Sequence, residues 1–282
     1  MKCAWQAYLN ILPHRMRQDV DQYGRDLLQE LHIRIGQPVE MVLSQENRYL
    51  SVIAGKEDVA FVVNAASEYS PWAARTLGKG FVTAPGGHRI GVCGSATISE
   101  GRMVGISLPT SLCLRVARDF DGIATMAAGA TDSVLIIGPP GSGKTTLLRD
   151  LIRIKSSKKI GNISVVDERE ELFPLYKGQP CFFAGEHTDI LSGCEKAEGI
   201  QVVLRSMNPS WIAVDEITEK DDCEALLQAG WCGIRLMATA HAGSVQDLLT
   251  RPVYRPLVEY KLFSTVIVLR RDKTWTMERM YI

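Results

Sequence analysis

The segment GPPGSGKT at residues 138–145 matches the pattern G-x-x-x-x-G-K-[ST], a glycine-rich loop followed by Lys and a hydroxyl residue. In such a loop, backbone N–H groups point inward at phosphate oxygens, and the helix that follows adds the partial positive charge of its N-terminus. Lys144 is then expected to reach the β- and γ-phosphates of ATP, and the Thr145 hydroxyl to bind Mg²⁺. The predicted nucleotide-binding residues are Gly138, Pro139, Pro140, Gly141, Ser142, Gly143, Lys144, Thr145 and Thr146.

A second chemical element is the segment SWIAVDE, an apolar run that ends in Asp215 and Glu216. Ligands bind at the carboxyl ends of strands in open α/β sheets, so the two acids are expected beside the phosphates. Asp215 is the predicted Mg²⁺ ligand, acting through water, and Glu216 is placed to orient or deprotonate the attacking water. The alternative is a pair of strand-end acids that face solvent.

Two further clusters compete for roles in the same site. His241 ends the apolar segment IRLMATAH, and it is predicted either to sense the γ-phosphate or to be a hydrogen-bonded structural residue. The segment VVDEREE at residues 165–171 is predicted to end a strand on the nucleotide side of the sheet, where Glu168 or Glu171 would rival Glu216 as the base. A solvated helix start is the alternative for these acids.

Three arginines, Arg89, Arg102 and Arg115, lie outside the segments that carry the loop and the acids. ATPases often obtain a positive charge for the γ-phosphate from another domain or subunit, and it contributes about 10³–10⁵-fold in rate. We expect one of the three to act in this way. The residues around each arginine do not indicate which of the three acts on the γ-phosphate.

The elements that must position these residues fall into two regions. Residues 1–120 predict a smaller α+β domain, and residues 121–132 (DGIATMAAGATD) predict a linker whose Gly and Ala content suits a hinge. Residues 133–282 alternate apolar strands with helical segments, which predicts a three-layer α/β domain. A strand between the P-loop strand and the strand of Asp215 would make it a RecA-like P-loop ATPase domain of the extra-strand class.

Within the first domain, residues 14–31 predict a helix, and HIRIGQPVEMVL predicts a strand, a turn and a strand. Residues 56–78 predict helix, with a second helix starting at Ser70–Pro71. The segment from GFVTAPGGHRIG onward predicts a meander of antiparallel strands. The chain is predicted to close with a hairpin around Arg271–Lys273.

Composition narrows the class of protein. Lys plus Arg equals Asp plus Glu, 32 of each, so no overall positive field is available to hold a nucleic acid. The seven cysteines show no metal-ligand spacing and read as buried residues of a reducing compartment. We found neither a secretory signal nor a membrane-spanning run, which predicts a cytoplasmic protein.

Taken together, the segments GPPGSGKTTLLRD, VVDEREEL, CEKAEG, LRSMNPSWIAVDEI and ATAHA resemble the stage III sporulation protein AA family of endospore-forming bacteria. ELHIRIGQPV, GFVTAPGGHRIGVCG and SLCLRVARDFDG resemble the N-terminal half of that family, so the resemblance covers nearly the whole chain. The family is similar to the traffic ATPases of type II and type IV secretion and of type IV pili.

The resemblance implies a hexameric ring that hydrolyses Mg-ATP on membrane proteins of the channel complex between mother cell and forespore. It implies a peripheral location in the mother-cell cytoplasm, and it assigns 167–171 as the acidic box and His241 as the histidine box. Arg205 falls on the arginine that precedes Asp215. Two departures are Glu195, where Pro is expected, and Asp215, where traffic ATPases usually have Gly.

Three functions compete on these observations. The first is the ATPase ring coupled to a membrane channel. The second is a nucleic-acid-dependent RecA-like motor, against which the zero net charge argues. The third is a nucleotide-gated structural subunit with slow turnover.

Overall fold

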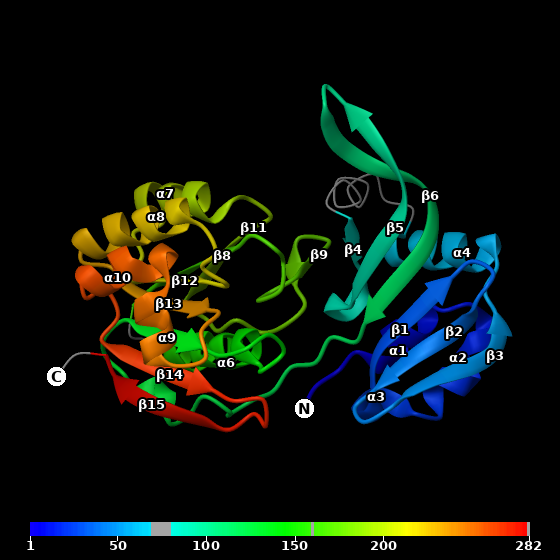
Figure 1. Ribbon diagram of the computed structural model, residues 1–282, viewed down its shortest axis with the longest axis horizontal. Coiled ribbons are helices and arrows are strands. Elements are labelled where there is room, and N and C mark those ends of the chain that lie inside the picture. The colour runs from blue at the N-terminus through cyan, green and yellow to red at the C-terminus, as the bar shows by residue number, and fades with distance from the viewer. Residues whose placement is uncertain (69–79, 159–160, 281–282) are drawn as a thin grey trace. The chain divides into compact units, whose positions relative to one another are not determined.

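The computed structural model describes residues 1–68, 80–158 and 161–280, which form two compact units (Figure 1). Unit 1 comprises residues 1–119 and 175–182, and unit 2 comprises residues 120–174 and 183–282. The predicted helix start at Ser70–Pro71 lies outside the described residues.

Unit 1 is built on an antiparallel sheet with the strand order β3-β2-β1-β6-β5-β4. Its helices are α1 (Trp5–Asn10), α2 (His14–Asp21), α3 (Gly24–Leu27), α4 (Lys56–Ser67) and the 3₁₀ turn η1 (Pro85–Gly87). Its strands are β1 (Leu28–Arg34), β2 (Pro38–Leu43), β3 (Asn47–Ile53), β4 (Phe81–Thr83), β5 (Arg89–Ser99), β6 (Arg102–Arg115) and the short pair β9 (Leu175–Tyr176) and β10 (Gln179–Pro180). The predicted strand-turn-strand and meander are confirmed.

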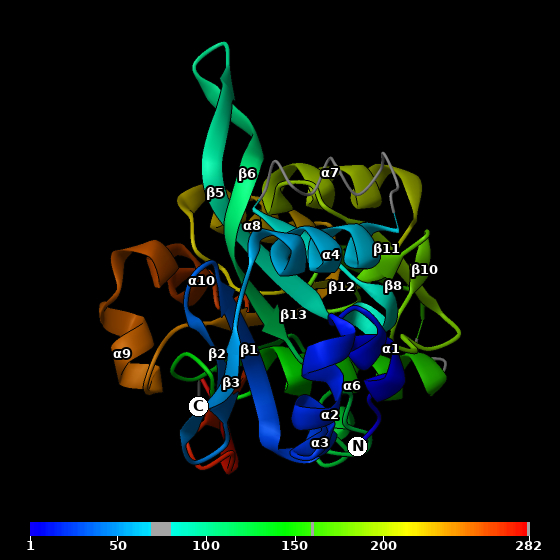
Figure 2. The ribbon, with the colours of Figure 1, turned by 90° about the vertical axis from the view of Figure 1, so that its right-hand side faces the viewer.

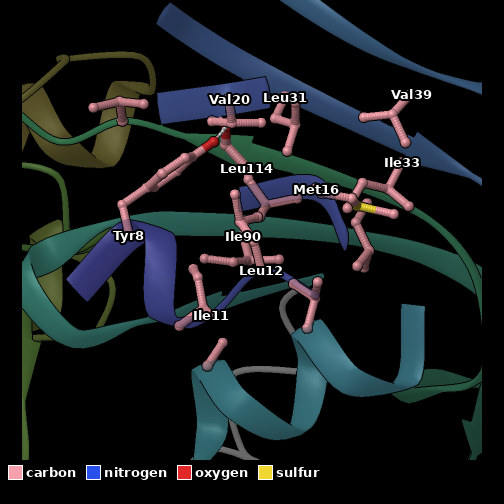
Figure 3. Close-up of a cluster of buried hydrophobic side chains, with 14 of the residues drawn as sticks. Tyr8, Ile11, Leu12, Met16, Val20, Leu31, Ile33, Val39, Ile90 and Leu114 are labelled. Carbon is pink, nitrogen blue, oxygen red and sulfur yellow. Dashed lines mark hydrogen bonds between the residues drawn. The ribbon is translucent and has the colours of Figure 1, made fainter. Parts of the chain in front are cut away.

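One face of this sheet carries the core of unit 1 (Figure 3). Leu31 and Leu114 project from neighbouring strands and pack with Leu12 and Met16 from the helical N-terminus, all of them buried. The Tyr8 hydroxyl donates a hydrogen bond to the carbonyl of Leu114 at 3.2 Å, so the one polar atom of that ring is paired inside the core.

The predicted helix over 14–31 is wrong for its last four residues. Gly24 has φ +66°, which interrupts the helical path, and from Leu28 the chain is a strand with alternating burial. The strand β3 was not predicted, because most of its side chains are exposed and show no clean apolar alternation.

β5 and β6 extend as a two-stranded arm beyond the other strands of their sheet (Figure 2). Glu100 and Gly101 join them with positive φ at both positions, as in the turns that match the twist of a hairpin. The pairing is irregular around Gly94, where a Cβ would meet the Leu108 carbonyl oxygen at 2.5 Å. Leu108 itself is 76% exposed and has φ +48°.

Unit 2 is built on a mainly parallel sheet with the order β11-β8-β12-β13-β7-β14-β15, in which only the β14–β15 pair is antiparallel among the described strands. Its strands are β7 (Val134–Ile137), β8 (Ile163–Asp167), β11 (Thr188–Ser192), β12 (Trp211–Val214), β13 (Arg235–Ala240), β14 (Thr265–Leu269) and β15 (Trp275–Arg279). Its helices are α6 (Lys144–Ser157), α7 (Lys196–Ser206), α8 (Lys220–Trp231), α9 (Val245–Thr250), α10 (Arg255–Glu259) and the 3₁₀ turns η2 (Ala127–Gly129) and η3 (Pro252–Tyr254).

The sheet of unit 2 is covered on both faces, with α7 and α8 over one and α6 across the other (Figure 1). Leu135 and Ile137 of β7 belong to the core that includes Leu226 of α8. Because β13 lies between β7 and β12, the predicted three-layer RecA-like class with an extra strand is confirmed, as is the closing hairpin. Among the described residues no helix is long and apolar enough to cross a membrane.

The predicted linker, residues 121–132, is held against α6 within unit 2. The buried Asp150 carboxylate accepts hydrogen bonds from the backbone N–H groups of Gly122 at 3.2 Å and Ala124 at 2.7 Å. Ala127 and Ala128 are buried, so the small side chains of this segment serve close packing instead of a hinge. The segment 175–182, in turn, groups with unit 1 although the sequence analysis placed it in the ATPase domain.

Candidate nucleotide-binding site

The loop between β7 and α6 has a backbone that only glycine adopts without strain. Gly141 has φ +72° and Gly143 has φ +102°, both in the left-handed region. A Cβ on Gly138 would lie 2.7 Å from the Ser142 hydroxyl and 2.8 Å from the Leu269 carbonyl oxygen. The Ser142 hydroxyl is buried and has no hydrogen-bond partner within the described chain, so this loop fits the phosphate oxygens of a nucleotide.

Lys144 opens α6, and its ammonium uses three acceptors close by. It donates to the carbonyls of Gly138 at 2.9 Å and Pro139 at 3.1 Å, and it lies 3.0 Å from His241 Nδ1. Burial lowers the pKa of Lys144, whereas Asp215 and Glu216 oppose that shift. These contacts must be exchanged for phosphate oxygens when a nucleotide binds.

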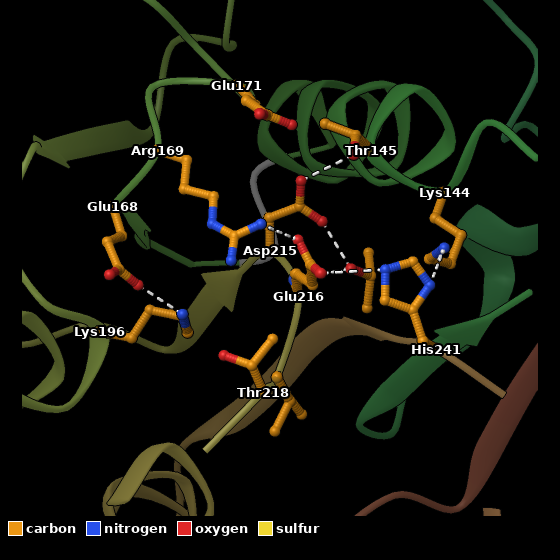
Figure 4. A network of polar contacts seen from close by, with 12 residues as sticks. Lys144, Thr145, Glu168, Arg169, Glu171, Lys196, Asp215, Glu216, Thr218 and His241 are labelled. Carbon is orange, nitrogen blue, oxygen red and sulfur yellow. Dashed lines mark hydrogen bonds and ion pairs between the residues drawn. The ribbon is translucent and has the colours of Figure 1, made fainter. Parts of the chain in front are cut away.

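Asp215 follows β12 and joins the loop to the sheet (Figure 4). Its Oδ2 accepts a hydrogen bond from the Thr145 hydroxyl at 2.7 Å, and its Oδ1 accepts one from the Thr239 hydroxyl at 2.5 Å. Oxygen ligands of this kind suit Mg²⁺, which binds through one or two carboxylates plus phosphates and water. The predicted metal ligands Thr145 and Asp215 are therefore brought together, and they fit the ion.

Glu216 turns out of the strand with φ +50°, and its backbone N–H donates to the Thr239 hydroxyl at 2.8 Å. Its carboxylate forms an ion pair with Arg169 and lies 3.0 Å from His241 Nε2. Because the Lys144 ammonium is only a donor, His241 Nδ1 accepts and Nε2 carries the proton that is donated to Glu216. His241 thus links Lys144, the predicted phosphate ligand, to Glu216, the predicted base.

Thr239 is a residue that the sequence analysis did not single out, although it lies two positions before His241 on β13. We expect Thr239→Val to lower kcat for ATP hydrolysis by about 10–100-fold, the range for groups that orient a metal ligand. The valine keeps the shape but leaves Asp215 and the Glu216 N–H without their shared hydroxyl. Steady-state assays against the exposed control Thr250→Val measure this, and equal kcat values would show that the hydroxyl does not position the acids.

The acidic residues that follow β8 contact different partners. Glu168 forms an ion pair with Lys196, whose side chain is 5% exposed and also lies 3.5 Å from Asp222. Glu171 donates its backbone N–H to Asp167 at 2.9 Å, and its carbonyl accepts from an arginine of α6. A small pocket is lined by Asp167, Glu168, Arg169, Lys196, Asp215 and Glu216. Of the two rival acids, only Glu168 lines this pocket with Glu216, and it is ion-paired with a buried cation.

Asp167 provides a pH-dependent contribution to stability. Burial raises its pKa from 3.8 to about 6, although backbone N–H groups of Phe173 and Glu171 favour the ionised form. The pKa of Asp167 is higher in the folded than in the unfolded protein. The stabilising contribution of its protonated carboxyl is therefore complete below about pH 4 and is lost as the pH rises through about 6. We expect the free energy of unfolding of the parent, relative to Asp167→Asn, to fall by up to about 3 kcal/mol from pH 4 to 7. Urea unfolding across this range measures it, and a flat difference would contradict the raised pKa.

The three candidate arginines all lie in unit 1. The Arg89 guanidinium lies 3.9 Å above the ring of Phe81, and Arg115 forms an ion pair with Glu30 at 3.1 Å. Arg102 begins β6, and its side chain lies outside the described part of the chain. Their action on a nucleotide stays a prediction.

Two lysines that contact the site elements were missed. Lys196 starts α7 and reaches Glu168, while Lys273 at the turn of the closing hairpin donates to the Gly141 carbonyl in the loop. The only sequence signal for Lys196 was its place in the segment CEKAEG, and nothing local marked Lys273, since its partner is far away in the chain.

The comparisons with known proteins agree with this fold. The pilus retraction motor PilT with bound ADP matches with a TM-score of 0.61 at 15% identity, over 90% of this chain and 76% of that one. The ATPase DotB of Legionella pneumophila matches with a TM-score of 0.55 at 16% identity, over 94% and 79%. These likenesses show the fold alone, a RecA-like α/β domain preceded by a smaller N-terminal domain.

The sequence comparisons confirm the family that the motifs resemble. Stage III sporulation protein AA of Bacillus subtilis (strain 168) is 36% identical over 276 residues, 93% of this chain and 90% of that protein. The family model described as "Sporulation stage III, protein AA" matches residues 5–280. This chain belongs to that sporulation family.

Proposed function

We propose that the protein hydrolyses Mg-ATP to ADP and phosphate. The observation that carries the proposal is the connected path from Lys144 through His241 to Glu216, set beside the paired oxygens of Thr145 and Asp215. Phosphate-binding, metal-binding and water-activating groups therefore converge at one edge of one sheet. This is the set of parts that phosphoryl transfer to water requires.

Each group has a definite task in this reaction. The loop N–H groups and Lys144 would hold the phosphates. Thr145 and Asp215 would hold Mg²⁺, which would supply positive charge to the phosphates. Glu216 accepts the proton of the attacking water, and the neutral His241 holds this carboxylate in place with its Nε2–H. Both acids are ion-paired, Glu168 with the buried Lys196 and Glu216 with the half-exposed Arg169. Glu216 is the proposed base because it also contacts His241 and directly follows Asp215.

We further propose that the protein acts as a ring of identical subunits, six by the family resemblance, peripheral to a membrane on the cytoplasmic side. Membrane proteins of the sporulation channel complex would be its partners, and assembly or transport its work. This proposal is supported by the similarity of the chain to the pilus retraction motor PilT and to the type IV pilus assembly ATPase PilB of Pseudomonas aeruginosa, which is 27% identical over 133 residues. The side chain of Arg169 is 50% exposed and that of Glu216 is 25% exposed. Groups outside the site can therefore reach the proposed base.

The test is steady-state ATPase activity across a protein-concentration series, with the mass of the particles measured at each concentration. Specific activity that rises as subunits associate would support the ring. Activity that stays flat over a range in which association occurs would contradict it. Stimulation by single-stranded DNA would favour the nucleic-acid motor, and tight ATP binding without turnover at any concentration would favour the nucleotide-gated subunit.

A further inference from the structure

Three potential metal ligands meet on the unit 1 sheet, on the face opposite its core. Glu30 and His32 project from β1, and Cys113 projects from β6 directly opposite His32 in the strand pairing. The ligand atoms of the three residues all lie within 4.8 Å of one another, and each side chain is half-buried. None of them belongs to the nucleotide site described above.

The distances among the three atoms are those of a tetrahedral site. Zinc bonds of about 2.3 Å to sulfur and about 2.0–2.1 Å to nitrogen or oxygen place tetrahedral ligands about 3.4 Å apart for N and O and about 3.6 Å apart for pairs with S. His32 Nε2 and Glu30 Oε2 are 3.2 Å apart, Cys113 Sγ and Glu30 Oε2 3.6 Å, and Cys113 Sγ and His32 Nε2 3.8 Å. Each value agrees with the tetrahedral one to within a few tenths of an ångström.

Arg115 and Gly91 form the surroundings of the cluster. Arg115 Nε lies 3.1 Å from the other carboxylate oxygen of Glu30, which leaves one oxygen facing the cluster. The Arg115 side chain also hydrogen-bonds to the Cys113 thiol, a contact that an ion would replace. On the next strand, Gly91 lies opposite Cys113, and a Cβ there would meet only Cys113, at 3.7 Å. The side toward β5 is therefore open to a fourth ligand, such as water.

We propose that Glu30, His32 and Cys113 bind one borderline-soft divalent transition-metal ion, best matched by Zn²⁺, with water as the fourth ligand. Thiolate and imidazole ligands select such ions over Mg²⁺, which prefers oxygen. The ion would tie β1 to β6 at one point of the sheet and would be chemically distinct from the Mg²⁺ of the nucleotide loop.

The test is a titration of the metal-free full-length protein with Co²⁺, a spectroscopic stand-in for Zn²⁺. We expect one equivalent to produce a thiolate-to-cobalt charge-transfer band and strong tetrahedral d–d bands, both abolished by Zn²⁺ but not by excess Mg²⁺. Cys113→Ser should remove the charge-transfer band, and His32→Gln should weaken binding by at least about 100-fold. Cys93→Ser, an exposed thiol on β5, is the matched control and should behave as the parent.

Each alternative result overturns the proposal. Absence of any cobalt spectrum would show a hydrogen-bonded triad without a metal. Equal spectra for the parent and Cys113→Ser, or loss in Cys93→Ser, would show adventitious binding by other thiols. Circular dichroism confirms that each variant is folded, and His32→Gln tests the site separately if Cys113→Ser does not fold.

Discussion

Replacing Glu216 with Gln is expected to lower kcat for ATP hydrolysis by about 10²–10⁴-fold, the usual contribution of a general base. The amide keeps the shape of the side chain and can still meet His241 and Arg169, but it takes no proton from water. The Kd for ATP should change little, because the phosphates are held by the loop and Lys144. Single-turnover hydrolysis and equilibrium binding of a fluorescent ATP analogue separate the two effects.

Glu168→Gln is the matched comparison for this result. Glu168 lies in the same small pocket but forms an ion pair with the buried Lys196, so its replacement is expected to cost far less in kcat. A loss in Glu168→Gln equal to that in Glu216→Gln would assign Glu168 a part in proton transfer. Full activity in Glu216→Gln would move the base to Glu168 or Glu171.

Replacing Lys144 with Ala is expected to lower kcat/KM by at least about 10²–10³-fold, as when a charged donor to a transferring phosphate is lost. Unlike Glu216→Gln, this variant should also bind ATP more weakly, because the lysine contacts the phosphates in the ground state. The same binding assay measures this difference.

Lys158→Ala is the control for the lysine variant, since Lys158 is an exposed residue just after α6. It should retain the parent Kd and kcat. Retained ATP affinity in Lys144→Ala would contradict the assignment of this ammonium to the phosphates and would place the nucleotide elsewhere.

Much of unit 2 and of its site could be predicted from sequence, because the signals are local. The loop at 138–145 sits directly between an apolar strand and a helix, and the acids Asp215 and Glu216 end a second apolar run. Parallel strands bring such carboxyl ends to one edge, so their proximity followed from the strand pattern alone.

The rest depended on contacts between distant residues. Lys196 and Thr239 complete the site from different elements, and no local pattern tells a buried Lys–Glu pair from a solvated one. The segment 121–132 was predicted to be a linker from its Gly and Ala content, but these residues are equally common in tightly packed segments. Only its hydrogen bonds to Asp150 of α6 distinguish packing from a linker. The strand β3 was equally invisible to periodicity, because most of its side chains are exposed and show no apolar alternation.

The backbone conformation of Glu216, with φ +50°, affects the stability of the fold at the position of the proposed base. Glycine adopts that conformation freely, whereas a side chain there stores a conformational energy of order 1–3 kcal/mol. Glu216→Gly would relieve this strain, but it would also remove the ion pair with Arg169, the contact with His241 and the proposed base. Backbone strain alone would favour glycine at this position. Glutamate at this position therefore holds the proposed base on a strained backbone, at a cost in stability.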